Sequence, residues 1–334
     1  MRINAYAAMA AKKNLQKFQY EPKELGPWDV EVKISHCGIC HSDVHLIDDD
    51  WAIGSYPLVP GHEIVGVVTA LGSNVTHLKN GLRLGIGWQR NACLTCEFCA
   101  RGEENMCTQN EAICVGHYGG YAEAIRTDSR FVFPIPENLN SEQVGPLMCG
   151  GITVFSPLRR YAVQPIMKVG VIGIGGLGHL ALQFTRAFGC EVTAFSTSPD
   201  KEAEARSFGA HHFINSNNKS AMEKAVNSLD FILNTLYVDI DWAAYLNILR
   251  PSGKICNVGA GANPITIPAS PLLVGQKSIC GSVIGGRAMI IDMLEFAARH
   301  DIQAKTEVVP MSEVNAAIDK VRQGKARYRM VLKN

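Results

Sequence analysis

A chain of 334 residues is longer than one ordinary domain, and we expect two domains. Hydrophobic residues make up 47% of the chain and charged residues 19%, which is typical of a globular protein. The formal net charge of +1 gives no reason to expect nucleic acid as a partner. No stretch approaches the roughly 20 unbroken apolar residues of a membrane span. The N-terminus lacks the apolar core of a signal peptide, so we expect a cytoplasmic protein.

Up to about Gly150 the chain is dense in short strand-like runs that glycine, proline and asparagine turns separate. This pattern is typical of a compact β-rich domain. A strand is expected to begin within the first six residues. The further expected strands are 30–34, 63–70, 83–88, 120–125 and 130–134.

From about residue 150, strand and helix patterns alternate. Helices are expected at 152–160, 177–188 and 201–208, and strands at 168–172, 191–195, 212–214, 231–234, 254–258 and 278–280. Such alternation predicts a doubly wound parallel sheet, so the fold class is α/β. Two amphipathic helices, 290–300 and 311–323, and a strand, 329–333, follow. We expect this last segment to return to the first domain, which gives 1–149 with 289–334 for one domain and 150–288 for the other.

An apolar strand pattern, 169–172, runs directly into glycines and then into apolar residues at helical spacing. The glycines have the G-x-G-x-x-G spacing of a turn that lets a dinucleotide pyrophosphate approach the backbone at a helix N-terminus. A second strand follows at the distance that a βαβ unit needs. The turn that would hold the pyrophosphate comprises Gly173, Gly175, Gly176, Leu177 and Gly178.

Four cysteines lie close together with the spacing C-x2-C-x2-C-x7-C, in a stretch without a competing strand or helix pattern. Four thiolates on one loop can close tetrahedrally around Zn²⁺, and a closed cysteine shell indicates a structural site. An iron-sulfur cluster is an alternative, and a redox pair is another that would leave two cysteines unexplained. The four residues are Cys93, Cys96, Cys99 and Cys107, within a lobe of about 90–108.

A second group of candidate ligands is dispersed. Thiols, imidazoles, a hydroxyl and a carboxylate crowd residues 36–45, while 61–63 and 148–150 add a further histidine, glutamate and cysteine. A catalytic zinc needs three protein ligands and one open position. Composition alone does not choose among these candidates.

Together, several motifs resemble those of the zinc-dependent medium-chain alcohol dehydrogenases. They are G-I-C-H-S-D-x-H at 38–45, G-H-E at 61–63, the four-cysteine lobe, P-L-M-C-G-G-I-T at 146–153, G-x-G-G-L-G at 173–178 and G-K-A-R-Y-R at 324–329. More narrowly, the chain resembles the cinnamyl alcohol dehydrogenase-like branch and its bacterial broad-range aldehyde reductases. The resemblance implies a GroES-like catalytic domain and a Rossmann cofactor domain.

For the site, the resemblance implies a catalytic zinc held by Cys40, His62 and Cys149, besides the structural zinc. It implies that Glu63 provides the carboxylate that approaches the metal during ligand exchange. Four residues near the ligands would act in catalysis: Ser42 and His45 as a proton relay, Asp43 as the carboxylate that orients the ligand histidine, and Glu63. Cys37, Cys114, His117, His179 and His211 are expected to be buried thiols or packing and solvated residues.

The second strand of the nucleotide domain ends without the carboxylate that binds the ribose 2'-hydroxyl of NAD. Ser196, Thr197 and Ser198 can donate hydrogen bonds to a 2'-phosphate, and Lys201 can offset its charge, so we expect NADP(H). Asp200 argues against this, but it follows a proline and is expected to begin the next helix. The resemblance adds Thr153, Val258, Ser282 and Arg329 as further cofactor contacts.

The implied reaction is hydride transfer between NADPH and an aldehyde that zinc polarises, with the reverse oxidation of a primary alcohol. Trp51, Trp88 and Tyr118 are candidate pocket walls for an apolar or aromatic aldehyde, although they could equally be core residues. The resemblance also implies a homodimer that pairs through an edge strand at 270–286.

Three other interpretations stay open. An NAD-dependent polyol or formaldehyde dehydrogenase of the same superfamily would keep the zinc ligands, but it predicts an acidic residue after the second strand of the nucleotide domain. A non-enzymatic zinc-binding module would need clustered basic residues beside the cysteines, where glutamates offset the arginines. A zinc-free quinone reductase on the same fold would have no need of the catalytic ligands.

Overall fold

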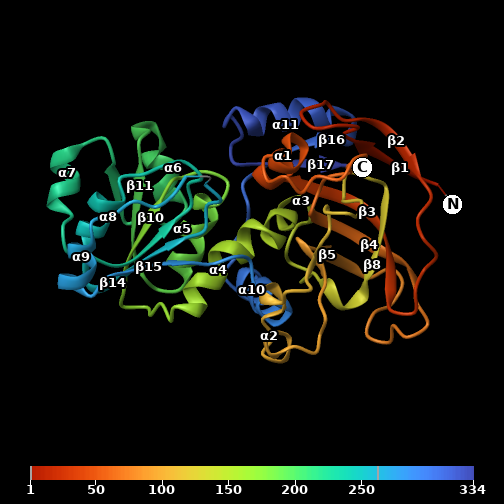
Figure 1. Ribbon diagram of the computed structural model, residues 1–334, viewed down its shortest axis with the longest axis horizontal. Coiled ribbons are helices and arrows are strands. Elements are labelled where there is room, and N and C mark those ends of the chain that lie inside the picture. The colour runs from red at the N-terminus through yellow and green to blue at the C-terminus, as the bar shows by residue number, and fades with distance from the viewer. Residues whose placement is uncertain (1, 262) are drawn as a thin grey trace. The chain divides into compact units, whose positions relative to one another are not determined.

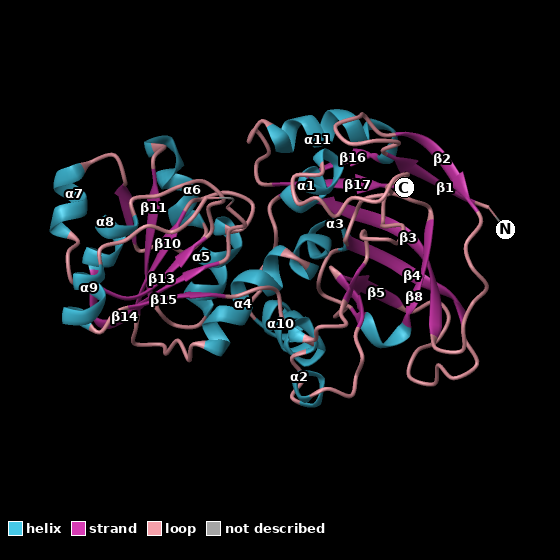
Figure 2. Cartoon of the chain, in the orientation of Figure 1, coloured by secondary structure: helices cyan, strands magenta, loops and turns pink. Residues whose placement is uncertain are grey.

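The computed structural model describes residues 2–261 and 263–334, so Met1 and Ala262 lie outside the description (Figure 1). The chain divides into two compact units. Unit 1 comprises Met1–Ile152 and Gly285–Asn334, and unit 2 comprises Thr153–Ile284. Unit 1 is β-rich and unit 2 alternates strands with helices, so the α/β fold class is confirmed (Figure 2). None of the helices among the described residues is long and apolar enough to cross a membrane.

Unit 1 is organised around the strand β3 (Asp29–Ile39), which pairs with three other strands. The seven-stranded sheet has the order β16-β17-β3-β4-β5-β9, and β8 also pairs with β3. Most side chains of β3 are buried, and neighbouring strands pair with its backbone on both edges. The other strands of the sheet are β4 (Glu63–Leu71), β5 (Arg83–Ile86), β8 (Ala124–Asp128), β9 (Val132–Pro134), β16 (Thr306–Pro310) and β17 (Arg329–Lys333).

Smaller elements complete unit 1. Helix α10 buries Ile290, Met293, Leu294 and Ala297, the spacing of one helical face. The helices are α1 (His41–Asp48), α2 (Glu97–Ala100), α3 (Ser141–Val144), α10 (Arg287–Arg299), α11 (Val314–Arg322) and the start of α4 (Gly150–Arg160). Two small sheets pair β1 (Ile3–Ala7) with β2 (Gln16–Tyr20) and β6 (Gln89–Asn91) with β7 (Glu111–Ala112). Helix α2 lies within the cysteine stretch, where no helix is expected from the sequence.

The expected strand at 120–125 is wrong in its position. The backbone N–H groups of Gly119, Gly120 and Tyr121 donate to the carbonyls of residues 59–61 instead of joining the sheet. A Cβ on Gly120 would lie 2.4 Å from Ile64, so glycine is needed for this close approach. The ladder therefore begins only at Ala124. The expected strand at 130–134 likewise begins late, because Asp128 caps a 3₁₀ turn over Ser129–Phe131.

Unit 2 contains a six-stranded, fully parallel sheet with the order β12-β11-β10-β13-β14-β15. Its first strand, β10 (Lys168–Ile172), is an apolar run that is buried almost throughout, as expected for a strand covered on both faces. The other strands are β11 (Glu191–Ser196), β12 (His212–Asn215), β13 (Leu229–Asn234), β14 (Leu249–Asn257) and β15 (Ser278–Gly281).

Helices cover the sheet of unit 2 between successive strands. Met222 of α7, Leu246 of α8 and Leu272 of α9 contribute to one apolar cluster, and Figure 1 shows these three helices together. The helices are α5 (Gly178–Ala187), α6 (Glu202–Ser207), α7 (Lys219–Lys224), α8 (Trp242–Ile248) and α9 (Ala269–Gly275). Strand order reverses between β10 and β13, the place where doubly wound sheets bind their ligands.

Candidate active site

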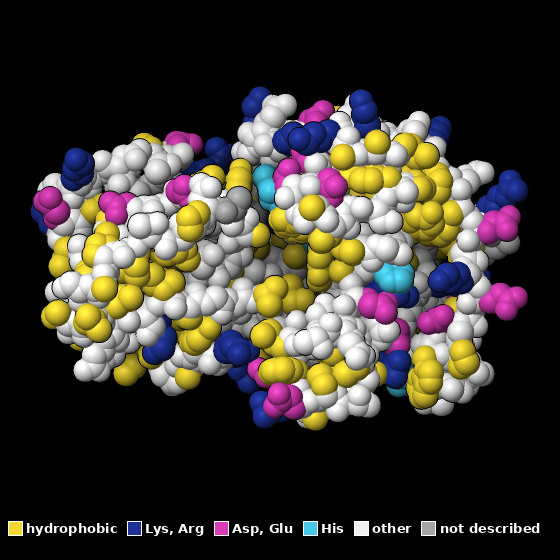
Figure 3. Space-filling view, in the orientation of Figure 1, with side chains coloured by type: hydrophobic (Ala, Val, Ile, Leu, Met, Phe, Trp, Pro, Cys, Tyr) yellow, Lys and Arg dark blue, Asp and Glu magenta, His cyan; other side chains and the backbone are white. Residues whose placement is uncertain are grey.

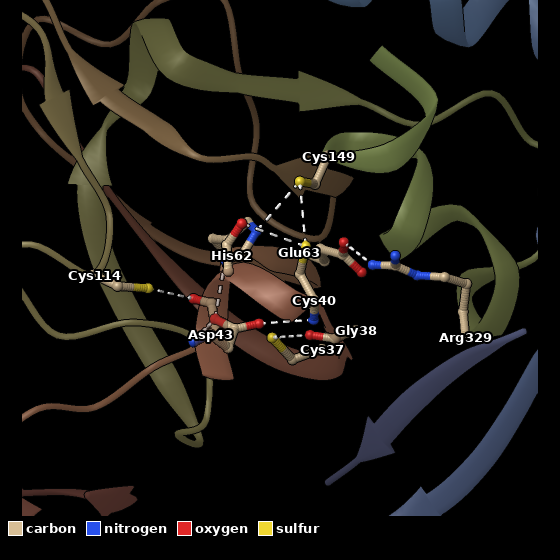
Figure 4. Close-up of polar contacts among 11 residues, drawn as sticks. Cys37, Gly38, Cys40, Asp43, His62, Glu63, Cys114, Cys149 and Arg329 are labelled. Atoms are coloured by element: carbon tan, nitrogen blue, oxygen red, sulfur yellow. Dashed lines mark hydrogen bonds and ion pairs between the residues drawn. The ribbon is translucent and has the colours of Figure 1, made fainter. Parts of the chain in front are cut away.

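Three donor side chains from distant parts of the sequence meet in unit 1 (Figure 4). Cys40 follows β3 and is the N-cap of α1, His62 precedes β4, and Cys149 precedes α4. The antiparallel pairing of β3 with β4 sets Gly38 opposite Glu63, which brings the first two donors to one end of the sheet. The structure therefore brings together the three residues that the resemblance assigns to a catalytic zinc.

The spacing of these donors suits a tetrahedral metal ion. The Sγ atoms of Cys40 and Cys149 lie 3.9 Å apart, and Nε2 of His62 lies 3.3 Å from Cys149 Sγ. Zinc–ligand bonds of about 2.0 to 2.3 Å in a tetrahedron give donor separations of about 3.3 to 3.8 Å. The hydrogen bond with Cys149 holds the pKa of Cys40 well below that of an ordinary thiol, which favours the thiolate that binds metal.

Asp43 fixes the ligand histidine from behind. Its Oδ1 lies 3.0 Å from Nδ1 of His62 and accepts the N–H of Gly61, and its Oδ2 accepts the N–H of Cys40. The bond from the Cys40 N–H to Asp43 is part of a capping box at the start of α1. The same carboxylate therefore caps the helix and orients the imidazole of His62. Burial lowers the pKa of His62, but Asp43 and Cys149 outweigh burial and raise it well above its ordinary value.

Glu63 and Arg329 form a buried ion pair beside the donors (Figure 4). Burial raises the pKa of Glu63 to about 7, although the Arg329 guanidinium acts in the opposite direction. Glu63 Oε2 has no hydrogen-bond partner among the described residues, so this oxygen is available to a metal ion. Arg329 is only 5% exposed and is held by Glu63, because a buried guanidinium needs a counter-charge. The expected contact of Arg329 with the cofactor stays a prediction.

The two expected relay residues both lie on α1. Ser42 Oγ is 3.7 Å from Cys40 Sγ. His45 lies near the end of the helix, with its Nδ1 2.7 Å from Oδ2 of Asp50. Asp50 was missed at the sequence level, because it follows the helix in a run of three aspartates that reads as a solvated surface.

Two of the three expected aromatic walls lie beside the donors. Trp51 and Trp88 meet edge to face with ring centres 6.3 Å apart, and the ring of Trp88 contacts His62 at 5.0 Å. The ring centre of Tyr118 lies 4.5 Å from that of Tyr20, and Tyr118 lines a cavity of about 470 Å³. The place of Tyr118 in a pocket wall stays a prediction.

The four-cysteine lobe forms a second donor set. Cys93 Sγ lies 3.9 Å from Cys99 Sγ and 3.5 Å from Cys107 Sγ, again the edges of a tetrahedron. The backbone N–H of Cys96 donates to Cys93, and such bonds lower the pKa of Cys93 to about 6. All four ligand atoms lie within 4.8 Å of one another. The chemistry of this set fits a structural zinc ion.

The glycine-rich turn in unit 2 has the geometry that a pyrophosphate requires. Gly173 follows β10 and adopts φ +86°. A Cβ on Gly178 would lie 1.8 Å from the carbonyl oxygen of Gly173. A Cβ on Gly175 would meet nothing within 4 Å, so space for a ligand lies over this glycine. Gly176 and Leu177 complete the turn, and α5 begins at Gly178, so the turn leads directly into a helix N-terminus.

The hydroxyl-rich segment follows directly after β11. Ser196, the last residue of that strand, accepts the N–H of Ser198 through Oγ. Nζ of Lys201 donates to the carbonyl of Ile174, which ties the segment to the glycine-rich turn. Thr197 lies between Ser196 and Ser198 in the sequence. Asp200 is part of a 3₁₀ turn before α6, as expected. The structure therefore brings the expected ribose-end residues next to the turn.

The remaining expected contacts lie at strand and helix ends in unit 2. Val258 and Ser282 directly follow β14 and β15, and Thr153 is a buried residue of α4. Cys37 and Cys114 are buried thiols, as expected. The expected non-ligand histidines make local contacts: His117 with Glu111, His179 with the carbonyl of Gly175, and His211 with the N–H of Val192.

Comparison with known proteins identifies the class. Residues 26–137 match the alcohol dehydrogenase GroES-like domain, and residues 176–299 match the zinc-binding dehydrogenase family. The chain belongs to the zinc-dependent medium-chain alcohol dehydrogenase superfamily, whose enzymes interconvert alcohols and aldehydes.

Individual relatives match nearly the whole chain. An aldehyde reductase AdhA from a Synechocystis species is 45% identical over 330 residues, which covers 99% of this chain and 98% of the relative. A cinnamyl alcohol dehydrogenase from Sorghum bicolor superposes with a TM-score of 0.96 at 37% identity, covering 100% and 98% of the two chains. The enzyme of the same type from Helicobacter pylori, solved with NADP(H), gives 0.93 at 31% identity, again covering 100% and 98%.

Proposed function

We propose that this enzyme is an NADPH-dependent aldehyde reductase with one catalytic and one structural zinc ion per chain. The observation that carries the proposal is the donor set of Cys40, His62 and Cys149, which has tetrahedral spacing and an orienting carboxylate on its histidine. A catalytic zinc with three protein ligands keeps its fourth position open for the substrate oxygen.

The protein's own residues prepare the reaction. When bound, zinc polarises the carbonyl as a Lewis acid and NADPH supplies the hydride. Asp43 keeps His62 in the tautomer that presents Nε2 to the metal. Ser42 and His45 provide the protein side of the path that delivers a proton to the product oxygen, and Glu63 offers a carboxylate oxygen for ligand exchange.

The preference for NADPH rests on the segment after β11. Ser196, Thr197 and Ser198 offer hydroxyl groups, and Lys201 offers a positive charge, where an NAD enzyme would present a carboxylate. The Helicobacter pylori relative, solved with NADP(H), supports this choice. In the present structure Nζ of Lys201 is bound to a carbonyl, so it would exchange that bond for the 2'-phosphate.

Trp51 and Trp88 support an apolar or aromatic substrate, since Trp88 packs against His62 and Trp51 packs against Trp88. The printed names of relatives do not choose among substrates: a probable formaldehyde dehydrogenase is 42% identical and a probable mannitol dehydrogenase 40% identical. An NAD-dependent formaldehyde or polyol dehydrogenase is therefore the second candidate. The homodimer and the cytoplasmic location stay predictions.

Initial rates of nicotinamide oxidation test the proposal. The zinc-loaded enzyme should reduce cinnamaldehyde and hexanal with NADPH much faster than with NADH, and a strong chelator should stop the reaction. Lys201→Ala should raise the KM for NADPH about tenfold and leave the KM for NADH unchanged, since one charge-assisted contact is lost. Lys219→Ala, on α7, is the matched control.

Other outcomes would redirect the assignment. Preference for NADH, with oxidation of mannitol or formaldehyde by NAD, would favour the second candidate and contradict the argument from residues 196–201. Cys40→Ser should abolish turnover while the thermal unfolding temperature stays close to that of the wild type. Full activity in that variant would remove Cys40 from the ligand set.

A further inference from the structure

Unit 2 places a pair of asparagines at the carboxyl edge of its sheet. Asn234 ends β13 and Asn257 ends β14, and the two residues are register partners. Because β13 pairs with β10, Asn234 lies at the point where strand order reverses. On the face of this unit that Figure 3 shows, charged side chains are scattered and form no single patch. Asn234, in contrast, is only 1% exposed, and an amide is costly to bury without hydrogen-bond partners.

The two amides bind each other and the loops that follow both strands. Nδ2 of Asn234 donates to Oδ1 of Asn257 at 2.8 Å. Oδ1 of Asn234 accepts the N–H of Leu236 at 3.2 Å, and Nδ2 of Asn257 donates to the carbonyl of Gly259 at 3.0 Å. Since a backbone N–H only donates and a carbonyl only accepts, these two groups fix which way each amide points. One unbroken chain of hydrogen bonds therefore joins the loop after β13 to the loop after β14.

The backbones of the two loops are also in contact. The N–H of Val258 donates to the carbonyl of Asn234 at 3.0 Å. A Cβ on Gly259 would lie 1.8 Å from the carbonyl oxygen of Leu236, so the two loops leave no room between them at this point. A shift of one loop must therefore move the other or break the chain of amides.

The loop after β13 also holds the glycine-rich turn. Oγ1 of Thr235 donates to the carbonyl of Ile172 at 2.8 Å and lies 3.1 Å from the carbonyl oxygen of Gly173. A Cβ on Gly173 would lie 2.4 Å from Cδ2 of Leu236, so the leucine side chain covers this glycine. Asn234 binds the N–H of Leu236 and so acts on the glycine-rich turn through a single residue.

We propose that the amide pair of Asn234 and Asn257 positions the loops that receive the nicotinamide half of the cofactor. The inference rests on the proposed function, which supplies a nicotinamide dinucleotide. A doubly wound sheet binds a dinucleotide across the point where strand order reverses, with one mononucleotide to each half. The half with the glycine-rich turn and the segment after β11 takes the adenosine end, which leaves the loops after β13 and β14 to the nicotinamide end. Asn234 and Asn257 are thus positioning residues that act through the backbone of these loops.

Binding titrations with the zinc-loaded full chain, without substrate, test the proposal. We expect Asn234→Ala to weaken NADPH binding about tenfold, because Asn257 and the N–H of Leu236 lose their partner and the loops are released. NADPH fluorescence measures this affinity. Adenosine 2',5'-bisphosphate, which lacks the nicotinamide half, should bind to the variant within about twofold of the wild type by calorimetry.

Asn218→Ala is the matched control. Asn218 caps α7 by accepting the N–H of Ala221 at 3.1 Å, so the same residue type loses a hydrogen bond outside the two loops. Both ligands should bind to this variant as they bind to the wild type. Unchanged NADPH affinity in Asn234→Ala, or equal weakening of both ligands, would overturn the proposal.

A double variant separates positioning from stability. Asn234→Leu combined with Asn257→Leu replaces both partners by apolar side chains of similar size, so neither amide is left unpaired. Its thermal unfolding temperature should therefore lie above that of Asn234→Ala. NADPH binding should nevertheless stay about tenfold weaker than in the wild type, since neither loop regains its hydrogen bond. Wild-type affinity for NADPH in the double variant would show that the pair only fills space and would contradict the proposal.

The same titrations distinguish this inference from the proposed function. A wild-type chain that binds NADH and not NADPH would contradict the proposed cofactor. The comparison of wild type with Asn234→Ala then decides the inference with NADH and AMP as the two ligands. A wild-type chain that binds neither dinucleotide would overturn both proposals.

Discussion

Asp50 Oδ2 lies 2.7 Å from Nδ1 of His45, at the end of helix α1. With its Nδ1–H donated to Asp50, the imidazole presents Nε2 to its other partners, which is the tautomer a proton relay needs. We expect Asp50→Asn to lower kcat about tenfold, part of the hundredfold or more that general acid–base catalysis supplies. The KM for NADPH and the zinc content should stay unchanged, since Asp50 contacts neither site.

Asp48→Asn is the matched control for this prediction. Asp48 belongs to the same acidic run but pairs with Arg322 of α11. Equal losses of kcat in the two variants would show that the acidic run acts through the stability of α1 rather than through His45.

A second prediction concerns the anchoring of the cysteine lobe. Glu104 is 1% exposed; its Oε1 accepts Nε of Arg287 at 2.7 Å, and its Oε2 accepts the N–H of Arg287 at 3.0 Å. The carboxylate thus binds the N-terminus of α10, where a negative charge is favoured. We expect Glu104→Gln to lower the free energy of unfolding by about 2 kcal/mol, the loss of a charge-assisted bond.

Chemical denaturation of the zinc-loaded protein measures this effect. Glu97→Gln serves as control, because its pair with Arg101 is exposed and should contribute under about 0.5 kcal/mol. A Glu104→Gln variant as stable as the wild type would show that α10 holds its position without the lobe.

A third prediction concerns the glycine-rich turn. His179 is fully buried in the first turn of α5, with Nδ1 3.1 Å from the carbonyl oxygen of Gly175 and its ring against Phe208. A buried imidazole that binds this carbonyl helps to fix the turn. We expect His179→Ala to raise the KM for NADPH about tenfold, equivalent to about 1.4 kcal/mol, with a smaller change in kcat.

Gln183→Ala controls for general damage to α5, since Gln183 donates to the backbone carbonyl of His179 within the helix. Titration of NADPH fluorescence gives the same comparison without turnover. If His179→Ala binds NADPH with unchanged affinity, the imidazole serves packing alone.

A fourth prediction tests the two tryptophans. Trp51 packs against both His45 and Trp88, at ring separations of 5.1 and 6.3 Å. We expect Trp51→Ala to change the ratio of kcat/KM between cinnamaldehyde and hexanal about tenfold, because a pocket contact of this size is worth about 1 to 3 kcal/mol. Tyr118→Ala should leave the ratio unchanged, since Tyr118 packs against Tyr20 and Phe18.

Elements with an unbroken local signal are predictable from this sequence. Strands 168–172 and 329–333 have the expected bounds, because each contains a short apolar run that is buried in a sheet. Helix α1 has no such signal: only three of its eight residues are apolar, and its capping box uses Cys40, a residue type that is rarely an N-cap. The stretch at 120–125 has strand-like composition, but its backbone bonds go to residues 59–61.

For the functional site, too, the sequence alone predicts only the parts that have a local signal. The cysteine lobe is visible from spacing alone, since its donors lie within 15 residues of sequence. Cys40, His62 and Cys149 meet only because β3 pairs with β4, and the resemblance to a family was needed to choose them. The pairs of Asp50 with His45 and of Glu104 with Arg287 depend on loop geometry and tertiary packing, and no sequence pattern marks them.

The position of β17 has a consequence for biosynthesis. This strand lies inside the sheet of unit 1, between β16 and β3, and its first residue supplies the guanidinium that pairs with Glu63. A ribosome makes it only after all of unit 2. Until then β3 has an open edge, and a carboxylate destined for burial lacks its counter-ion. Unit 2 is one continuous stretch and can fold at once, so the nascent chain carries a finished nucleotide-binding fold attached to a half-built catalytic one, the stage at which aggregation threatens most.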